Sequence, residues 1–102
     1  METFRRKRLE IVVEAPMLEA LERMLGEIGV TGYTVVAGRE GSGSSGRWIE
    51  EGFTSAFEKR IVIAVTTADT AEKVFARLKT FFQRYSGVVF ASDVDVMRAE
   101  KF

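Results

Sequence analysis

The sequence predicts a single α+β domain in which one sheet of four strands carries two helices on the same face. Strand-like and helix-like hydrophobic patterns follow one another as βαβ, a long loop, and βαβ again. With 46% hydrophobic and 29% charged residues, the composition is that of a globular protein. A chain of 102 residues can bury one core but not a second independent one, so we expect residues 1–102 to form one domain.

The first βαβ unit begins with alternating apolar residues, which predict a strand over residues 8–14. Pro16 then starts an amphipathic helix whose apolar residues recur at every third or fourth position. Gly29 suits the left-handed position that ends such a helix. The β-prone residues 33–36 follow and predict the second strand.

The second βαβ unit begins at residues 60–65, whose continuous apolar run predicts a central strand buried on both faces. Asp69 and Glu72 have the spacing of a capping box at the start of a second helix. Residues 88–91 predict a fourth strand, and residues 94–97 extend it or pair with it. We expect the second helix to place these apolar residues in the core: Val74, Phe75, Leu78, Phe81 and Phe82.

This order of elements gives a ferredoxin-like βαββαβ sandwich, with an antiparallel or mixed sheet and both helices on one face. The other face then lacks cover. Val12, Val62 and Ala64 make the first and third strands apolar on both sides. We therefore expect the helix-free face to be buried against further copies of the chain in a closed homo-oligomer.

Residues 39–54, between the second and third strands, lack a steady period and are predicted to form a long mobile loop. Glycines and serines suit a backbone cradle for phosphate or carbonate, although the composition alone favours a flexible linker. Trp48 and Phe53 predict a contact with a protein partner, unless they pack back onto the body of the domain.

A small anion in this loop would need charged or hydroxyl donors beside the glycine backbone. Arg39 and Arg47 can each hold a planar anion with two parallel hydrogen bonds, and Ser42 offers a hydroxyl. These three residues are the candidate bicarbonate site.

Composition excludes several kinds of chemistry. The chain has no Cys and no His, which rules out thiolate nucleophiles, disulfides, Cys/His metal sites and histidine acid–base catalysis. We expect no catalytic site and no metal site. Fifteen basic and fifteen acidic residues argue against a nucleic-acid partner. The absence of a long apolar run argues against membrane insertion, and the N-terminus does not resemble a secretion signal, so we expect a cytoplasmic protein.

The segment Leu18–Val35, with Gly-Val-Thr-Gly-Tyr-Thr-Val at its end, resembles the first helix and second strand of the PII-like signal-transduction family. The glycine-rich loop after it and the strand at residues 60–65 extend the resemblance over nearly the whole chain. It implies a homotrimer that binds adenine nucleotides in clefts between subunits. It also implies that the loop at residues 39–54, called the T-loop, signals to a protein target that the sequence does not identify.

The resemblance implies a set of adenine contacts. Thr34 matches the family threonine that contacts adenine, and its hydroxyl can both donate and accept. Val62 and Ala64 match positions of the third strand whose backbone reads the edge of the base.

The resemblance also implies phosphate contacts. Gly41 and Gly43 match the glycines at the base of the T-loop, with an offset of one residue, and Gly87 matches the end of a second phosphate loop. Basic positions near the C-terminus are represented by Arg98 and Lys101.

Two departures from the family pattern narrow the implied function. The second phosphate loop is shortened to Tyr85–Val88, and Val88 stands where the family has a lysine, so we expect ADP or AMP to be preferred over ATP. The T-loop has no tyrosine for uridylylation, which argues against nitrogen signalling with 2-oxoglutarate.

Both departures resemble PII-like proteins of inorganic-carbon metabolism, including carboxysome-associated ones. That resemblance implies coupling of nucleotide to bicarbonate, with no tightly bound cofactor. The alternatives are a structural oligomerisation or protein-interaction domain without nucleotide, and a nitrogen-regulatory PII protein.

Overall fold

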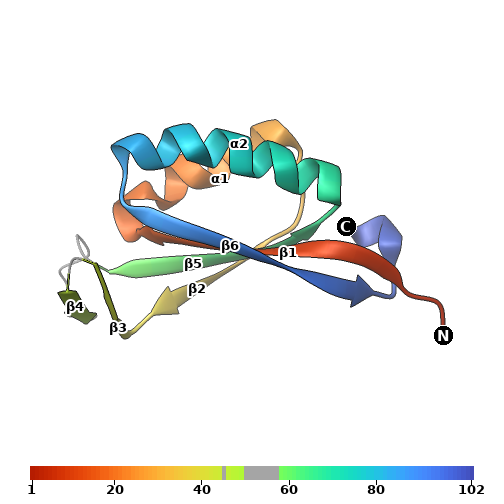
Figure 1. Ribbon diagram of the computed structural model, residues 1–102, viewed down its shortest axis with the longest axis horizontal. Helices are drawn as coiled ribbons and strands as arrows, with labels where there is room; N and C mark the ends of the chain where they lie inside the picture. Colours follow the sequence, from red (N-terminus) through yellow and green to blue (C-terminus); the bar gives the residue numbers. More distant parts are fainter. Residues whose placement is uncertain (45, 50–57) are drawn as a thin grey trace.

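The computed structural model describes residues 1–44, 46–49 and 58–102. Its main sheet has four antiparallel strands in the order β2-β5-β1-β6, and both helices lie on one face of it (Figure 1). This confirms the ferredoxin-like α+β class. In chain order the elements are β1 (Phe4–Glu14), the one-turn helix η1 (Ala15–Met17), α1 (Leu18–Ile28), β2 (Thr34–Gly38), β3 (Glu40–Gly43), β4 (Gly46–Ile49), β5 (Lys59–Thr66), α2 (Ala68–Arg84), β6 (Gly87–Val96) and η2 (Ala99–Lys101).

The first strand is longer than its sequence pattern predicts, because β1 begins at Phe4 rather than at Arg8. The added residues include basic side chains that stand directly opposite acidic ones on β6, with Arg5 paired to Asp95 in the register. Opposite charges at facing positions favour strand pairing. The alternation of apolar residues in β1 alone could not show this, since the acidic partners come at the other end of the chain.

The first helix has the ends that the sequence predicts. Pro16 lies in η1, which leads directly into α1. Gly29 ends the helix with φ at 109°, in the left-handed region that side chains disfavour. Leu21 and Leu25 are fully buried and direct the apolar stripe of α1 toward the sheet.

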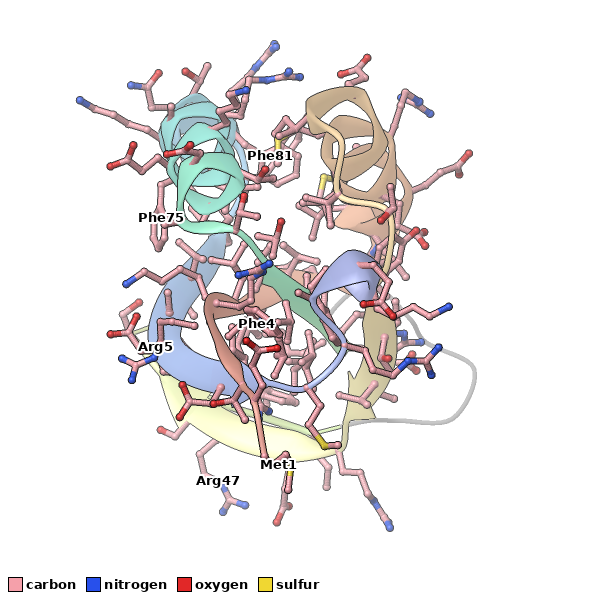
Figure 2. The ribbon with its side chains drawn as sticks, turned by 90° about the vertical axis from the view of Figure 1, so that its right-hand side faces the viewer. Met1, Phe4, Arg5, Arg47, Phe75 and Phe81 are labelled. Atoms are coloured by element: carbon pink, nitrogen blue, oxygen red, sulfur yellow. The ribbon has the colours of Figure 1, made fainter. Side chains whose placement is uncertain are left out.

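The second helix departs from the prediction at two places. Thr67, rather than Asp69, is its N-cap: the Thr67 hydroxyl accepts a hydrogen bond from the Thr70 amide at 3.2 Å. Phe75 is not a core residue, since 40% of it is exposed. Figure 2 shows Phe75 on the flank of α2 that faces away from α1.

The prediction of an unstructured loop over residues 39–54 is wrong for its described part. Strands β3 and β4 form an antiparallel hairpin there, inserted between β2 and β5. Gly46 enters β4 with φ at 101°, a conformation that glycine adopts readily. Glycines and serines gave the hairpin no apolar alternation, so no strand signal was visible. Phe53 lies outside the described residues, and the mobility of this segment stays a prediction.

The core lies between the sheet and the two helices. Val62 and Ala64 point into it and are 0% and 1% exposed, so the expectation that they make the helix-free face apolar is wrong. Because side chains alternate along a strand, the neighbours of Val62 and Ala64 in β5 lie on the helix-free face instead. The largest fully buried side chains are Leu9, Ile11, Val13, Leu21, Leu25, Val62, Val74 and Leu78.

The helix-free face nevertheless has an apolar row, beside charged residues such as Arg8 and Glu10. One row across the whole sheet consists of Val36, Ile61, Val12 and Val88, one residue from each strand. In the single chain Val88 is 57% exposed, and Phe90, two residues further along β6, is 52% exposed. A contiguous apolar surface of this kind marks a face that contacts another molecule.

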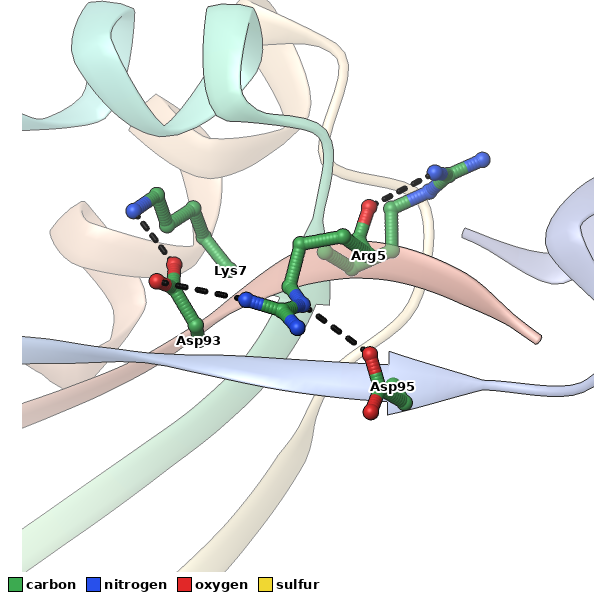
Figure 3. Close-up of polar contacts among 5 residues, drawn as sticks. Arg5, Lys7, Asp93 and Asp95 are labelled. Carbon is green, nitrogen blue, oxygen red and sulfur yellow. Dashed lines mark hydrogen bonds and ion pairs between the residues drawn. The ribbon is translucent and has the colours of Figure 1, made fainter.

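Beyond the end of β5, strands β1 and β6 continue together as a two-stranded ribbon toward both chain termini (Figure 1). Figure 3 shows its charged pairs: Arg5 Nε donates to Asp95 at 2.9 Å, and Lys7 Nζ donates to Asp93. The hydrogen bond and charge of Lys7 lower the pKa of Asp93. The hydrogen bond to Asp95 raises the pKa of Arg5.

We expect Asp93 to give the fold a pH dependence. Because its folded-state pKa lies below the unfolded value of about 3.9, its contribution is complete above that value and is lost as pH falls through the folded one. Asp93→Asn should therefore lower the thermal midpoint at about pH 7 and should lower it by less at about pH 2, because protonation of Asp93 weakens the charge pair. The difference should be small and should shrink in high salt, because the pair is exposed. Calorimetry at the two pH values tests this, and equal differences at both would contradict it.

Candidate functional site

The candidate site residues fall on opposite edges of the sheet. Thr34 begins the edge strand β2, and Gly41 and Gly43 lie in the hairpin that follows it. Gly87 begins β6 at the other edge, three strand spacings or roughly 14 Å across. Arg98 follows the far end of β6. One chain by itself therefore does not bring these residues together.

Of the residues proposed to contact adenine, Thr34 begins β2, and Val62 and Ala64 are in β5. Thr34 is exposed and pairs with Ile63 of β5, and its side chain is on the helix-free face. The ladder with β2 ends at this pair, so β5 has no strand neighbour on that side from Ala64 onward within the described residues. Beyond that pair the backbone N–H and C=O groups of β5 that face away from β1 have no strand partner in the described part of the chain, so a ligand can form hydrogen bonds with them. The backbone of Val62 is not open in this way, because Val62 pairs with β2 on one side and with β1 on the other.

Trp48 closes the base of the hairpin. Its half-buried indole lies across Gly41, its partner in the β3–β4 register, and against Gly38 at the end of β2. A Cβ at Gly41 would come within 2.6 Å of the ring, and one at Gly38 within 2.9 Å. The ammonium of Lys59 lies 5.8 Å from the ring centroid, at cation–π distance. Gly41 thus has a packing role, and a contact of Trp48 with a partner protein stays a prediction.

Sequence reasoning missed Gly38 and Lys59 as parts of this cluster. Nothing in the pattern pointed to Gly38, because it ends an ordinary β-prone run. A tryptophan two strands later, beside a short turn rich in glycine, is the signal that could have found it, since indole rings pack well over positions without a Cβ.

The candidate anion residues surround the same hairpin and are all exposed. Ser42 and Arg47 face each other across the two strands, and Arg47 Nη2 lies 3.7 Å from a carboxylate oxygen of Glu40. Arg39 makes no ion pair with any residue in the part of the chain that the structure describes. The guanidinium of Arg39 is therefore more available to an anion than that of Arg47. Beside it is an open hollow lined by Ala37, Arg39, Glu40 and Ile49.

Gly87 also has a packing explanation. A Cβ there would lie 2.5 Å from the ring of Phe82 and 2.8 Å from the carbonyl oxygen of Val12. Glycine therefore lets the end of α2 close tightly over the start of β6. Only Tyr85 and Ser86 connect the two elements, which leaves little backbone for a phosphate loop.

The C-terminal candidates lie elsewhere. Arg98 is exposed, with its Nε 3.5 Å from Glu100 Oε1, and Lys101 is in η2 next to the chain end. Among residues 1–44, 46–49 and 58–102, no group of three or more acidic side chains could hold a metal ion. No helix in these ranges is long and apolar enough to cross a membrane.

Comparison with known proteins gives the chain a family. The family described as nitrogen regulatory protein P-II matches residues 6–101. No curated protein matches the chain.

Solved structures of similar sequence cover nearly the full length of both chains. CPII, a nitrogen regulatory PII-like protein from Thiomonas intermedia K12 solved with ADP, AMP and bicarbonate, is 31% identical, with a TM-score of 0.91 over 99% of this chain and 96% of that one. CPII with ADP and bicarbonate is 32% identical, with a TM-score of 0.89 over 99% and 97%. A proposed PII-like signalling protein from Thermus thermophilus is 25% identical, with a TM-score of 0.85 over 100% and 99%.

The family match and the superposition on solved structures both extend over almost the whole chain. The chain therefore belongs to the nitrogen regulatory protein P-II family and has the fold of its PII-like members.

Proposed function

We propose that this protein is a PII-like regulator that binds ADP or AMP in clefts between subunits, couples this binding to bicarbonate, and signals through its T-loop. The proposal rests above all on the full-length similarity to CPII, which was solved with ADP, AMP and bicarbonate. We further propose that it is not an enzyme and acts in the cytoplasm in inorganic-carbon metabolism.

A homotrimer would solve the problem that one chain leaves its candidate residues apart. The edge that carries Thr34 and the edge that carries Gly87 can contribute to one cleft only if they come from different subunits. The apolar helix-free face supplies the contact surface. That face also holds the Nε atoms of Arg6 and Arg8, which are buried without a hydrogen-bond partner among the described residues.

In this proposal the nucleotide lies along β2. Thr34 and the open backbone at Ala64 would contact the base, as the family resemblance implies. Gly38 is four residues further on, roughly 13 Å along an extended strand, where the hairpin begins. The amides at Gly41 and Gly43 would then lie on the phosphate side of the cleft.

The preference for ADP or AMP follows from the α2–β6 connection. Two residues join these elements, and Val88 brings no charge to the place where the family has a lysine. An outer phosphate would lack its charge-assisted hydrogen bond, whereas the inner phosphates depend on the hairpin.

Bicarbonate would bind at the hairpin through Arg39 and the Ser42 hydroxyl. Arg39 is exposed and borders the hollow beside β2, while Arg47 is already near Glu40. A planar guanidinium matches the oxygens of a planar anion.

We predict a homotrimer that Phe90→Asp converts to monomers. Phe90 is 52% exposed in one chain, so a charge there should leave the subunit folded and disrupt the contact between copies. Phe75→Asp is the matched control, because Phe75 is 40% exposed but lies on the helical layer. Light scattering with circular dichroism measures mass and folding. A monomeric wild type would remove the inter-subunit cleft and with it the proposed site.

We predict that ADP or AMP binds more tightly than ATP and that Val88→Lys raises the affinity for ATP relative to ADP. One restored charge-assisted hydrogen bond contributes about 1.5–3 kcal/mol, so the ratio should change by about tenfold or more. Val88→Met, which adds length without charge, should leave the ratio unchanged. Titration calorimetry measures all three proteins. Absence of heat with every adenine nucleotide would favour a structural oligomerisation domain instead.

We predict that bicarbonate and ADP tighten each other's binding by the same factor, as thermodynamic linkage requires. Trp48, packed on the hairpin base, should report both ligands by a change in emission. Arg39→Gln should abolish the bicarbonate effect and retain ADP binding, whereas Arg47→Gln should have a smaller effect because Arg47 is near Glu40. An ADP affinity that ignores bicarbonate in the wild type would contradict the coupling.

A further inference from the structure

The helical layer carries a groove that the proposed function does not use. It runs between α1 and α2, has a volume of about 340 Å³, and is lined by residues of α1 from Ala20 to Glu27 and of α2 from Arg77 onward to Tyr85. The two helices cover one face of the sheet, so this groove is on the opposite side of the molecule from the apolar face (Figure 1). It would stay open to partners in the proposed trimer.

The floor of the groove is apolar and aromatic. Phe81 reaches from α2 into the space between the helices (Figure 2). Its ring centroid is 4.9 Å from that of Tyr85, with the rings tilted by 53°. Met24 of α1 is buried against the core and also lines this floor. Such a surface can receive one further apolar or aromatic side chain.

The rim of the groove is positively charged, with three arginines and one carboxylate. Arg77 donates to Glu27 at 2.9 Å, which neutralises one end. At the other end, Arg23 lies 3.8 Å from Glu19 in a well-exposed pair, and Arg84 makes no ion pair with any described residue. The chain as a whole has no net charge, so this end is a local surplus of positive charge, from one weakly paired guanidinium group and one that has no ion pair among the described residues.

We propose that the groove is a docking site for an acidic peptide segment of a partner protein. An apolar side chain of that segment would pack on Phe81 and Tyr85, and its carboxylates would pair with Arg23 and Arg84. Guanidinium groups match carboxylates in charge and in bidentate geometry. A groove with an apolar floor can receive the apolar face of a peptide segment. Nucleic acid needs a larger positive surface than this neutral chain offers.

The test uses a fluorescein-labelled peptide of glutamates around two central phenylalanines, with fluorescence anisotropy as the readout. Two comparison peptides replace either the glutamates by lysines or the phenylalanines by serines. We expect only the acidic aromatic peptide to bind, and its binding to weaken as salt is added. Amide shifts in the NMR spectrum should map to α1 and α2. Equal binding of the lysine peptide, shifts confined to the hairpin or the sheet, or no binding of the acidic peptide would overturn the proposal.

Charge reversal supplies the matched variants. Arg23→Glu and Arg84→Glu should each weaken peptide binding by about tenfold or more. Lys79→Glu reverses a charge on α2 outside the groove and should change binding less than about twofold. ADP binding to Arg23→Glu should equal that of the wild type, which separates this proposal from the nucleotide site. Equal peptide binding by Arg23→Glu and wild type would overturn the proposal, as would self-association that Arg84→Glu abolishes, since a second copy would then be the occupant.

Discussion

The structure depends on a central antiparallel pair, β1 and β5, whose helix-covered face is apolar throughout and whose other face is apolar at Val12 of β1 and along β5. On one face Leu9, Ile11 and Val62 are covered completely by the two helices. On the other face Val12 and Ile61 continue into an apolar row that reaches both edges of the sheet. Two helices cannot cover both faces, so the same strands that build the core of one chain also leave apolar side chains uncovered on its other face.

The proposed contact between copies would explain how the candidate site is distributed. A sheet that packs through its free face brings its edges near those of neighbouring copies, and the candidate nucleotide residues lie at the edges. The glycines among them contribute to the fold even in one chain. Gly41 admits the ring of Trp48, and Gly87 admits the ring of Phe82. Close approach of an aromatic ring and close approach of a phosphate both need a missing Cβ, so packing and the proposed phosphate contact would favour the same residue at these positions.

The elements whose apolar side chains repeat with a regular period could be predicted from the sequence. The prediction failed for elements that depend on residues distant in the chain or that have no apolar period. Leu21, Leu25 and Gly29 specified α1 locally. The extension of β1 through Arg5 depends on Asp95, which is distant in the chain and close only after folding. The hairpin is invisible to periodicity because its strands are made largely of glycine, serine and charged residues. Arg39 and Ser42 could be selected by their chemistry and Thr34 by the family resemblance, because a hydrophobic period does not mark a binding residue.

Val88 would connect the proposed assembly with the proposed ligand preference. Its side chain ends the apolar row on the helix-free face, in register with Val12, and it occupies the position where the family resemblance expects a lysine. A lysine there would place a charge at the end of an otherwise apolar row, where burial against another copy disfavours it unless a phosphate pairs with it. Valine avoids the free-energy cost of burying a charge, and it also leaves the position without a cation. The preference for nucleotides with fewer phosphates and the apolar contact between copies would then have the same physical origin, a single uncharged side chain at the start of β6.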